Sequence, residues 1–227
     1  MFIKEVKLNT GRLYELKEFY GSVLGLTLSS LDESSVSVKT KNSVLTFLSD
    51  QNTKGTDGPF YHIAFNIPDN QFKQAKKWLS ERADLIKYRG EDEFPFESWN
   101  ARAMYFYDPA GNILEFIARY DLRNSSEDKF SGKDILNVSE IGLPVRNAEI
   151  FIDKITAGFS LPLFSGDRKS FGAIGDDNGL MIVVPDKRIW YPNLKEAGIF
   201  PVTVIIRSGM EKVMRFPDLP YKIISES

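Results

Sequence analysis

The sequence contains no cysteine and a single histidine, His62. The lack of cysteine excludes a disulfide framework, a zinc–thiolate site and a cysteine nucleophile. The 29 basic and 31 acidic residues are nearly balanced, and no basic stripe or acidic tail is present, which argues against a nucleic-acid partner. No apolar run approaches the roughly 20 residues of a membrane helix, and the N-terminal stretch has no signal-peptide-like segment. We therefore expect no membrane partner and a cytoplasmic location.

A repeated pattern of strands and helices runs along the 227 residues, 42% of which are apolar. Strands rich in Val, Ile, Phe and Tyr are predicted at 3–9, 35–40, 43–49, 61–67, 101–107, 112–118, 138–145, 179–184, 201–207 and 221–225. Helices are predicted at 11–24, from Pro68-Asp69 to about 82, and from the N-cap Asn147 to 158. The pattern predicts an α+β fold of repeated modules, each built from a strand, a helix and further strands.

The modules suggest a division of the chain. A complete two-module domain is predicted at 1–121, followed by a polar, unpatterned linker at 122–137. A third module and a degenerate fourth would occupy 138–227, because the segment between the last two strands is too short and interrupted by proline. We expect the first two modules to close over one small-molecule site.

Three polar residues occupy the same register in the first strand of successive modules. Glu5, His62 and Glu140 are each followed by an apolar residue at the next position and another two positions later. Because side chains alternate between the faces of a strand, the apolar residues should meet the helices. The polar residues should then line the opposite, concave face.

Three stretches resemble the vicinal oxygen chelate superfamily, which includes glyoxalase I, fosfomycin- and bleomycin-resistance proteins, methylmalonyl-CoA epimerase and extradiol dioxygenases. They are LYELKEFYGSVLGL at 13–26, YHIAF at 61–65 and YFYDPAGNILEFI at 105–117. The last is the most specific, because an Asp-Pro-x-Gly-Asn turn followed by a strand glutamate is typical of this superfamily. The resemblance covers 1–120 well and 138–207 loosely. It implies an α+β architecture of repeated β-α-β-β-β modules that form curved mixed sheets. It implies this architecture more firmly than a reaction, since the superfamily hosts several chemistries.

The resemblance implies a metal site in the concave cup. Its four usual positions fall on Glu5, Thr46, His62 and Glu115, of which His62, Glu115 and Glu5 can bind a divalent Mn, Fe, Ni, Co or Zn ion. Glu115 or Glu5 would also move a proton. Taken alone, His62 fits a hydrogen-bonded structural histidine better than a ligand, and Glu5 could equally be a surface carboxylate.

The departures from the family pattern reduce the number of reactions that this chain could catalyse. An extradiol dioxygenase needs two histidines and one glutamate around iron, which one histidine cannot supply. Thr46 stands where glyoxalase I would have a glutamate. The third module offers Glu140 but has Ile182 where a carboxylate would be wanted and no histidine, so we expect no metal site in 138–227.

Substrate contacts are predicted from the 101–118 hairpin and the aromatic loop before it. Pairing Tyr107 with Asn112 would place Arg102, Met104 and Phe106 on the Glu115 face, although a one-residue slip would reverse that. Arg102 would bind an anionic substrate group or neutralise Glu115. Trp99 is a candidate for a lid over the cup, or for local packing. The segment 188–193 has no assigned chemistry.

Two functions follow from this pattern. The first is a divalent-metal-dependent enzyme of the glyoxalase type, a lyase, isomerase or transferase acting on a small molecule. The second is a metal-free protein that sequesters a small ligand, similar to the bleomycin-resistance members. The substrate is open. A homodimer is open too, because paired modules in this superfamily come from one chain or are exchanged between two.

Overall fold

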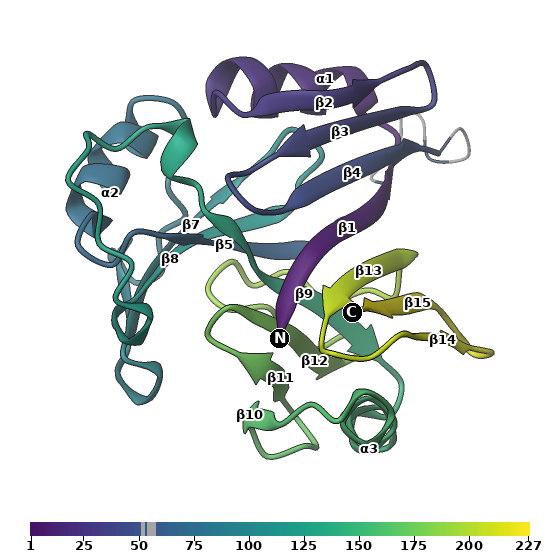
Figure 1. The fold of residues 1–227 in the computed structure, drawn as a ribbon. Coiled ribbons are helices and arrows are strands. Elements are labelled where there is room, and N and C mark those ends of the chain that lie inside the picture. The colour runs from purple at the N-terminus through teal and green to yellow at the C-terminus, as the bar shows by residue number, and fades with distance from the viewer. Residues whose placement is uncertain (51–52, 54–57) are drawn as a thin grey trace.

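The computed structural model describes residues 1–50, 53 and 58–227 and shows the predicted α+β fold (Figure 1). Its strands are β1 Phe2–Thr10, β2 Thr27–Leu31, β3 Ser35–Lys39, β4 Val44–Ser49, β5 His62–Ile67, β6 Phe94–Phe96, β7 Ala101–Tyr107, β8 Ile113–Arg119, β9 Asn137–Val145, β10 Leu163–Ser165, β11 Gly172–Asp176, β12 Gly179–Pro185, β13 Val202–Arg207, β14 Lys212–Phe216 and β15 Leu219–Glu226. The α-helices are α1 Leu13–Glu18, α2 Phe72–Ser80 and α3 Ala148–Phe159. The structure adds β2, β6, β10, β11 and β14, which are short, polar or glycine-containing and carry little apolar periodicity.

The helices lie close to the predicted positions, except that α2 begins at Phe72 and not at Pro68-Asp69. Asn147 caps α3, since its side chain accepts the backbone N–H of Ile150 at 3.0 Å. Helix α1 continues as a π-helical turn, Phe19–Val23, and Gly25 follows with a φ of 65°, as predicted for a left-handed C-cap. No helix among the described residues is long and apolar enough to cross a membrane.

The strands form two curved mixed sheets. One sheet has seven strands in the order β14-β15-β13-β1-β4-β3-β2, and the other has eight in the order β10-β11-β12-β9-β5-β8-β7-β6. In Figure 1, β1 to β4 and β13 to β15 thus lie in one sheet although they come from opposite ends of the chain. Module one joins the C-terminal remnant, and module two joins module three.

This pairing differs from the predicted closure of the first two modules over one site. Strand β1 lies between β4 and β13, whereas β5 lies between β8 and β9. Each module leaves its first strand open at one edge, and an open edge requires a partner. The local pattern is the same in every module, so it does not say which edge that partner supplies. The division at 122–137 stays a prediction, with both sheets continuing across it.

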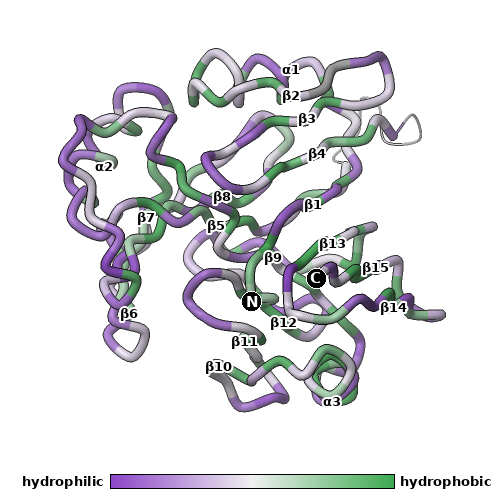
Figure 2. Tube along the Cα trace, in the orientation of Figure 1, coloured by the Kyte–Doolittle hydropathy of each residue, from purple (hydrophilic) through white to green (hydrophobic). Residues whose placement is uncertain are grey.

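The two faces of β5 separate the core from the site, as the alternation predicts. Ile63, Phe65 and Ile67 are fully buried in the main hydrophobic core, where the helices also pack. Ala64 belongs to a second, smaller cluster on the opposite face, and His62 lies on that face too. Figure 2 shows hydrophobic residues along β5 and β9 at the centre of the molecule, while the α2 region is largely hydrophilic. The central strands of the larger sheet therefore carry the polar site.

Candidate metal centre and ligand cavity

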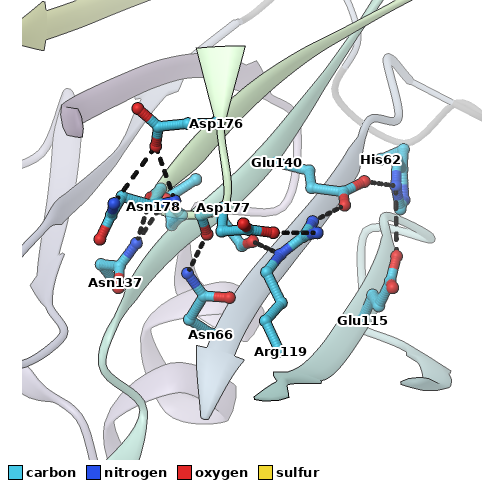
Figure 3. A network of polar contacts seen from close by, with 11 residues as sticks. His62, Asn66, Glu115, Arg119, Asn137, Glu140, Asp176, Asp177 and Asn178 are labelled. Atoms are coloured by element: carbon cyan, nitrogen blue, oxygen red, sulfur yellow. Dashed lines mark hydrogen bonds and ion pairs between the residues drawn. The ribbon is translucent and has the colours of Figure 1, made fainter. Parts of the chain in front are cut away.

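Three neighbouring strands bring one imidazole and two carboxylates together. His62 Nε2 lies 3.5 Å from Oε2 of Glu115 and 3.5 Å from Oε2 of Glu140 (Figure 3). One ligand atom from each of the three residues lies within 4.8 Å of the others, and all three side chains are buried. No other group of three such residues converges in this way among the described residues.

The register of the sheet explains this convergence. Ala64 of β5 is paired with Glu115 on β8 on one side and with Glu140 on β9 on the other. His62 precedes Ala64 by two residues and so points to the same face. The methyl side chain of Ala64 leaves space above β5, and the two carboxylates flank that space. Three adjacent strands thus place the three groups without any loop.

The structure corrects the expected third ligand. Glu5 lies on β1 in the other sheet, where its Oε1 accepts a hydrogen bond from Thr46 at 2.7 Å and lies 3.4 Å from Lys7 Nζ. Glu140 takes the place predicted for Glu5, because β9, not β1, is the neighbour of β5. That residues 138–227 hold no metal site of their own stays a prediction. Glu140 has no histidine in its own module, and the two residues that it meets, His62 and Glu115, come from module two.

A buried arginine holds Glu140 in place. Arg119 is fully buried, its Nη2 donates to Glu140 Oε1 at 2.5 Å, and its Nη1 lies 3.4 Å from Asp177 Oδ1. Its Nε donates to the Ser139 hydroxyl at 3.2 Å, and its guanidinium lies 5.3 Å from the centre of the Trp99 ring. Figure 3 shows Glu140 between Arg119 and His62, with one carboxylate oxygen directed to each. The sequence pattern did not single out Arg119.

The carboxyl of Glu115 has an unusual environment. Burial raises its pKa well above the ordinary value, and the neighbouring Glu140 raises it further. The charge of Arg119 and a hydrogen bond from Tyr105 act in the opposite direction. Burial and the same two glutamates raise the pKa of the Tyr105 hydroxyl. Tyr105 therefore remains a neutral hydrogen-bond donor at Glu115.

The hairpin register places three predicted substrate contacts on the wrong face. Tyr105, not Met104, is paired with Glu115. Met104 and Phe106 are fully buried in the main core, and Arg102 forms an ion pair with Glu93 at 3.3 Å. The turn between the strands is one residue longer than predicted, since Tyr107 pairs with Ile113, and a one-residue slip reverses both faces.

An aromatic cavity of about 370 Å³ opens onto the triad. Its wall also includes Ser165, Ile182 and Arg188, and its aromatic lining comes from Phe96, Trp99, Tyr105, Phe171, Trp190 and Tyr191. Trp99 thus lies at the cavity, as the lid prediction requires. The 188–193 segment supplies three of the lining residues. Its cluster of two aromatics and an arginine was the available signal, but the sequence did not show that this loop folds back over β9.

Gly142 makes room for this loop. A Cβ at Gly142 would lie 2.9 Å from the Trp190 ring and 3.2 Å from His62 Cβ. The Trp190 ring can therefore pack close to β9, and its centre lies 5.1 Å from that of the His62 ring. His62 Nδ1, on the other side of the imidazole, is buried without a hydrogen-bond partner in the described part of the chain.

The three side chains fit a divalent ion. Ligand atoms bound at ~2.0–2.2 Å in tetrahedral or octahedral geometry lie about 3.0–3.5 Å apart, close to the 3.5 Å separations around His62 Nε2. One imidazole and two carboxylates suit a borderline-to-hard cation. The fourth family position in this cup is Ile182, which cannot ligate, so the set leaves coordination positions facing the cavity. The free Nδ1 departs from the usual pattern, in which a ligating histidine donates its second N–H.

Solved structures share this fold across almost the whole chain. The putative dioxygenase of Bacillus subtilis subsp. subtilis str. 168 is 15% identical, with a TM-score of 0.64, and the match covers 99% of this chain and 85% of that one. Glyoxalase I from Zea mays is 13% identical, with a TM-score of 0.58 and coverage of 99% and 91%. At these identities the likeness shows the fold alone. No curated protein sequence matches the chain.

A family model gives the assignment. The model described as Glyoxalase/Bleomycin resistance protein/Dioxygenase superfamily matches residues 2–116, which is half of the chain and includes His62 and Glu115. The βαβββ modules and the polar site on the concave sheet face agree with that match. The chain therefore belongs to the Glyoxalase/Bleomycin resistance protein/Dioxygenase superfamily.

Proposed function

We propose that His62, Glu115 and Glu140 hold a divalent metal ion and that the cavity binds a small molecule whose oxygens complete the coordination. The observation that carries the proposal is the position of His62 Nε2, 3.5 Å from a carboxylate oxygen of each glutamate. Arg119 forms an ion pair with Glu140 but not with Glu115, so two buried carboxylates share one fixed cation, and a metal ion would supply the missing positive charge. Mn, Fe, Ni, Co and Zn are the candidate ions.

The proposed activity is that of a metal-dependent lyase, isomerase or transferase. A divalent ion at this position supplies Lewis-acid stabilisation of negative charge on substrate oxygens. Glu115 lies in the same cavity and is the residue proposed to move a proton to or from the substrate, with Tyr105 holding its carboxyl in place. Arg119 positions Glu140 from behind. The aromatic lining offers the substrate an apolar wall beside the triad.

The setting proposed for this activity is the cytoplasm, with a small molecule as partner and no nucleic acid or membrane. One chain supplies all three ligands. A homodimer is thus not needed to complete the site, and the oligomeric state stays a separate question for light scattering.

The proposed metal centre is tested by metal analysis of protein purified without chelator. We expect near-stoichiometric metal in the unaltered protein, or after incubation with Mn²⁺, Ni²⁺ or Zn²⁺ and removal of the excess. Glu140→Gln keeps the shape of the side chain but removes one anionic ligand. The metal affinity should therefore fall by about tenfold to a hundredfold. His62→Ala should abolish binding.

Glu5→Gln is the matched control, because Glu5 is the equivalent residue of module one but lies in the other sheet. Its metal content should equal that of the unaltered protein. Loss of metal in Glu5→Gln with retention in Glu140→Gln would contradict the site. Calorimetric titration with each ion gives the affinities.

The second candidate function is metal-free binding of a small ligand, as in the bleomycin-resistance type. The aromatic wall of the cavity favours it, because such a wall binds flat apolar molecules without any metal. Absence of metal even after reconstitution, together with ligand binding that His62→Ala leaves unchanged, would make this the better account.

A further inference from the structure

We infer that the cavity selects a flat aromatic or apolar ligand carrying one anionic group, and that Arg188 recognises this group. The inference rests on the proposed function in taking the same cavity as the ligand site and, for the balance of charge, in placing a divalent ion at the triad. It names the class of ligand, which the triad alone does not define. Three features of the described residues carry it: the shape of the wall, the state of Arg188 and the balance of charge.

The cavity wall fits a planar apolar body. Six aromatic side chains line it, and several are fixed by one another. The Trp99 ring stacks on Phe96 at 5.9 Å and meets Phe164 edge-on at 5.5 Å, and Tyr191 meets Phe94 edge-on at 5.4 Å. Rings held in this way lose little conformational freedom when a ligand enters, so a flat molecule binds to surfaces that are already in place.

Arg188 is a cation in this wall without a matching anion. Its guanidinium forms no hydrogen bond or ion pair with any residue that the structure describes, and it lies 5.6 Å from the centre of the Phe171 ring. Asp167 acts on it only from a longer distance, and that carboxylate is occupied by the backbone N–H groups of Lys169, Ser170 and Phe171. Half-buried arginines normally find a carboxylate or carbonyl partner. Here the five donors remain available to a ligand.

The other charges around the cavity are already paired. Arg119 is bound to Glu140 and Asp177, and the two glutamates of the triad are neutralised by a divalent ion when one is present. Arg188 then leaves one positive charge on the wall. A ligand with one negative charge completes the balance, and a planar carboxylate, sulfonate or phosphate can accept two donors from the guanidinium fork. Met104 and Phe106, by contrast, lie on the other face of the hairpin.

The test compares two probes of equal shape, 2-naphthalenesulfonate and the neutral 2-naphthalenesulfonamide. Sulfonate is a weak metal ligand, so a preference for it reports on the guanidinium and not on the ion. Calorimetric titrations are run on the full chain after chelator treatment and again with Mn²⁺. We expect the unaltered protein to bind the sulfonate at least about tenfold more tightly than the sulfonamide in both conditions.

Arg188→Gln should abolish this preference and leave sulfonamide binding unchanged, while Arg188→Lys should retain part of it. Arg102→Gln is the charge-matched control, because Arg102 lies on the opposite face of the hairpin and pairs with Glu93. The Arg102→Gln variant should keep the full preference for the sulfonate over the sulfonamide. Near-ultraviolet circular dichroism verifies that each variant is folded.

The inference is overturned if the unaltered protein shows no preference, if it binds neither probe, or if Arg188→Gln keeps the preference. These outcomes are separate from the metal test. A protein that binds no metal yet loses its sulfonate preference in Arg188→Gln would support the inference and refute the proposed metal centre. A protein that binds metal at His62 but shows no sulfonate preference would support the proposed metal centre and overturn the inference.

Discussion

A single buried arginine connects the triad to the rest of the sheet. Arg119 has no exposed surface, and every direction of its guanidinium meets an acceptor or a ring: Ser139, Glu140, Asp177 and Trp99. A charge removed from water in this way is tolerated only when it is paired and hydrogen-bonded. The same contacts fix the Glu140 carboxylate beside His62. Stability and site geometry thus depend on the same side chain.

Arg119→Met should lower the free energy of unfolding by about 3–5 kcal/mol, because it leaves the buried Glu140 without its cation. Urea unfolding followed by circular dichroism measures the change. The double variant Arg119→Met/Glu140→Gln should recover part of the loss, since no uncompensated charge remains. Arg102→Met, at a partly exposed ion pair, should change stability by less than ~1 kcal/mol. Equal losses of unfolding free energy in Arg119→Met and Arg102→Met would contradict the role of Arg119 as the buried partner of Glu140.

A glycine determines how closely the aromatic loop approaches the site. Gly142→Ala should displace Trp190, because the added Cβ would lie 2.9 Å from its ring, a distance that requires the ring to move. We expect a stability loss of about 1–3 kcal/mol and a shift in tryptophan emission. Gly21→Ala is the control, since its added Cβ would meet nothing closer than 3.6 Å. An unchanged emission spectrum in Gly142→Ala would show that Trp190 does not pack there.

At the scale of an element, the 108–112 turn joins β7 to β8 and fixes the register that presents Glu115. Asp108 Oδ1 accepts the backbone N–H of Ala110 at 2.9 Å and that of Asn112 at 3.0 Å. Its Oδ2 accepts from the Tyr20 hydroxyl at 3.0 Å and from the Asn112 amide at 2.7 Å. Despite these bonds, burial raises the pKa of Asp108 from 3.8 to about 6.

The shift at Asp108 predicts a pH-dependent stability. A carboxyl with a raised folded-state pKa binds its proton more tightly in the folded chain, so its contribution is fully present below pH 3.8 and is lost as the pH rises through about 6. The lost contribution amounts to about 3 kcal/mol. The free energy of unfolding is measured between about pH 4 and 7 for the unaltered protein and for Asp108→Asn. Because asparagine does not titrate, the difference between the two pH profiles gives the contribution of Asp108. An identical pH dependence in both proteins would refute the shift.

On the scale of the whole molecule, the two sheets tie the halves of the chain together. Strand β1 pairs with β13 and β5 pairs with β9, so each sheet contains strands from both sides of residues 122–137. The His62, Glu115 and Glu140 cluster lies across the second of these junctions. A fragment that ends at 121 keeps two of the three proposed ligands but leaves both first strands with an open edge.

Residues 1–121 alone should therefore unfold without a cooperative transition, and should bind metal more than tenfold less tightly than the full chain because Glu140 is missing. Mixing the fragments 1–121 and 122–227 should restore both properties in part. Thermal unfolding by circular dichroism and metal titration provide the measurements. A cooperative, metal-binding 1–121 fragment would support two self-contained domains instead.

The features that the sequence predicts well are local. Alternation along YHIAFNI places His62 opposite Ile63 and Phe65, and the structure has this arrangement because the period of two is a property of the strand itself. The hairpin at 101–118 was predicted with its strands correct and its register wrong. Its register depends on the hydrogen bonds that Asp108 makes within the turn, and one residue decides which face Arg102 occupies.

The choice between Glu5 and Glu140 is decided by tertiary structure alone. Both precede the same apolar pattern in the first strand of a module, so no local property distinguishes them. What distinguishes them is the pairing of β5 with β9 and of β1 with β13, which depends on edges that lie far apart in the chain. Arg119, Arg188 and Trp190 join the site for the same reason. Sequence periodicity therefore determined the modules and which residues of a strand share a face, and long-range strand pairing determined which residues meet.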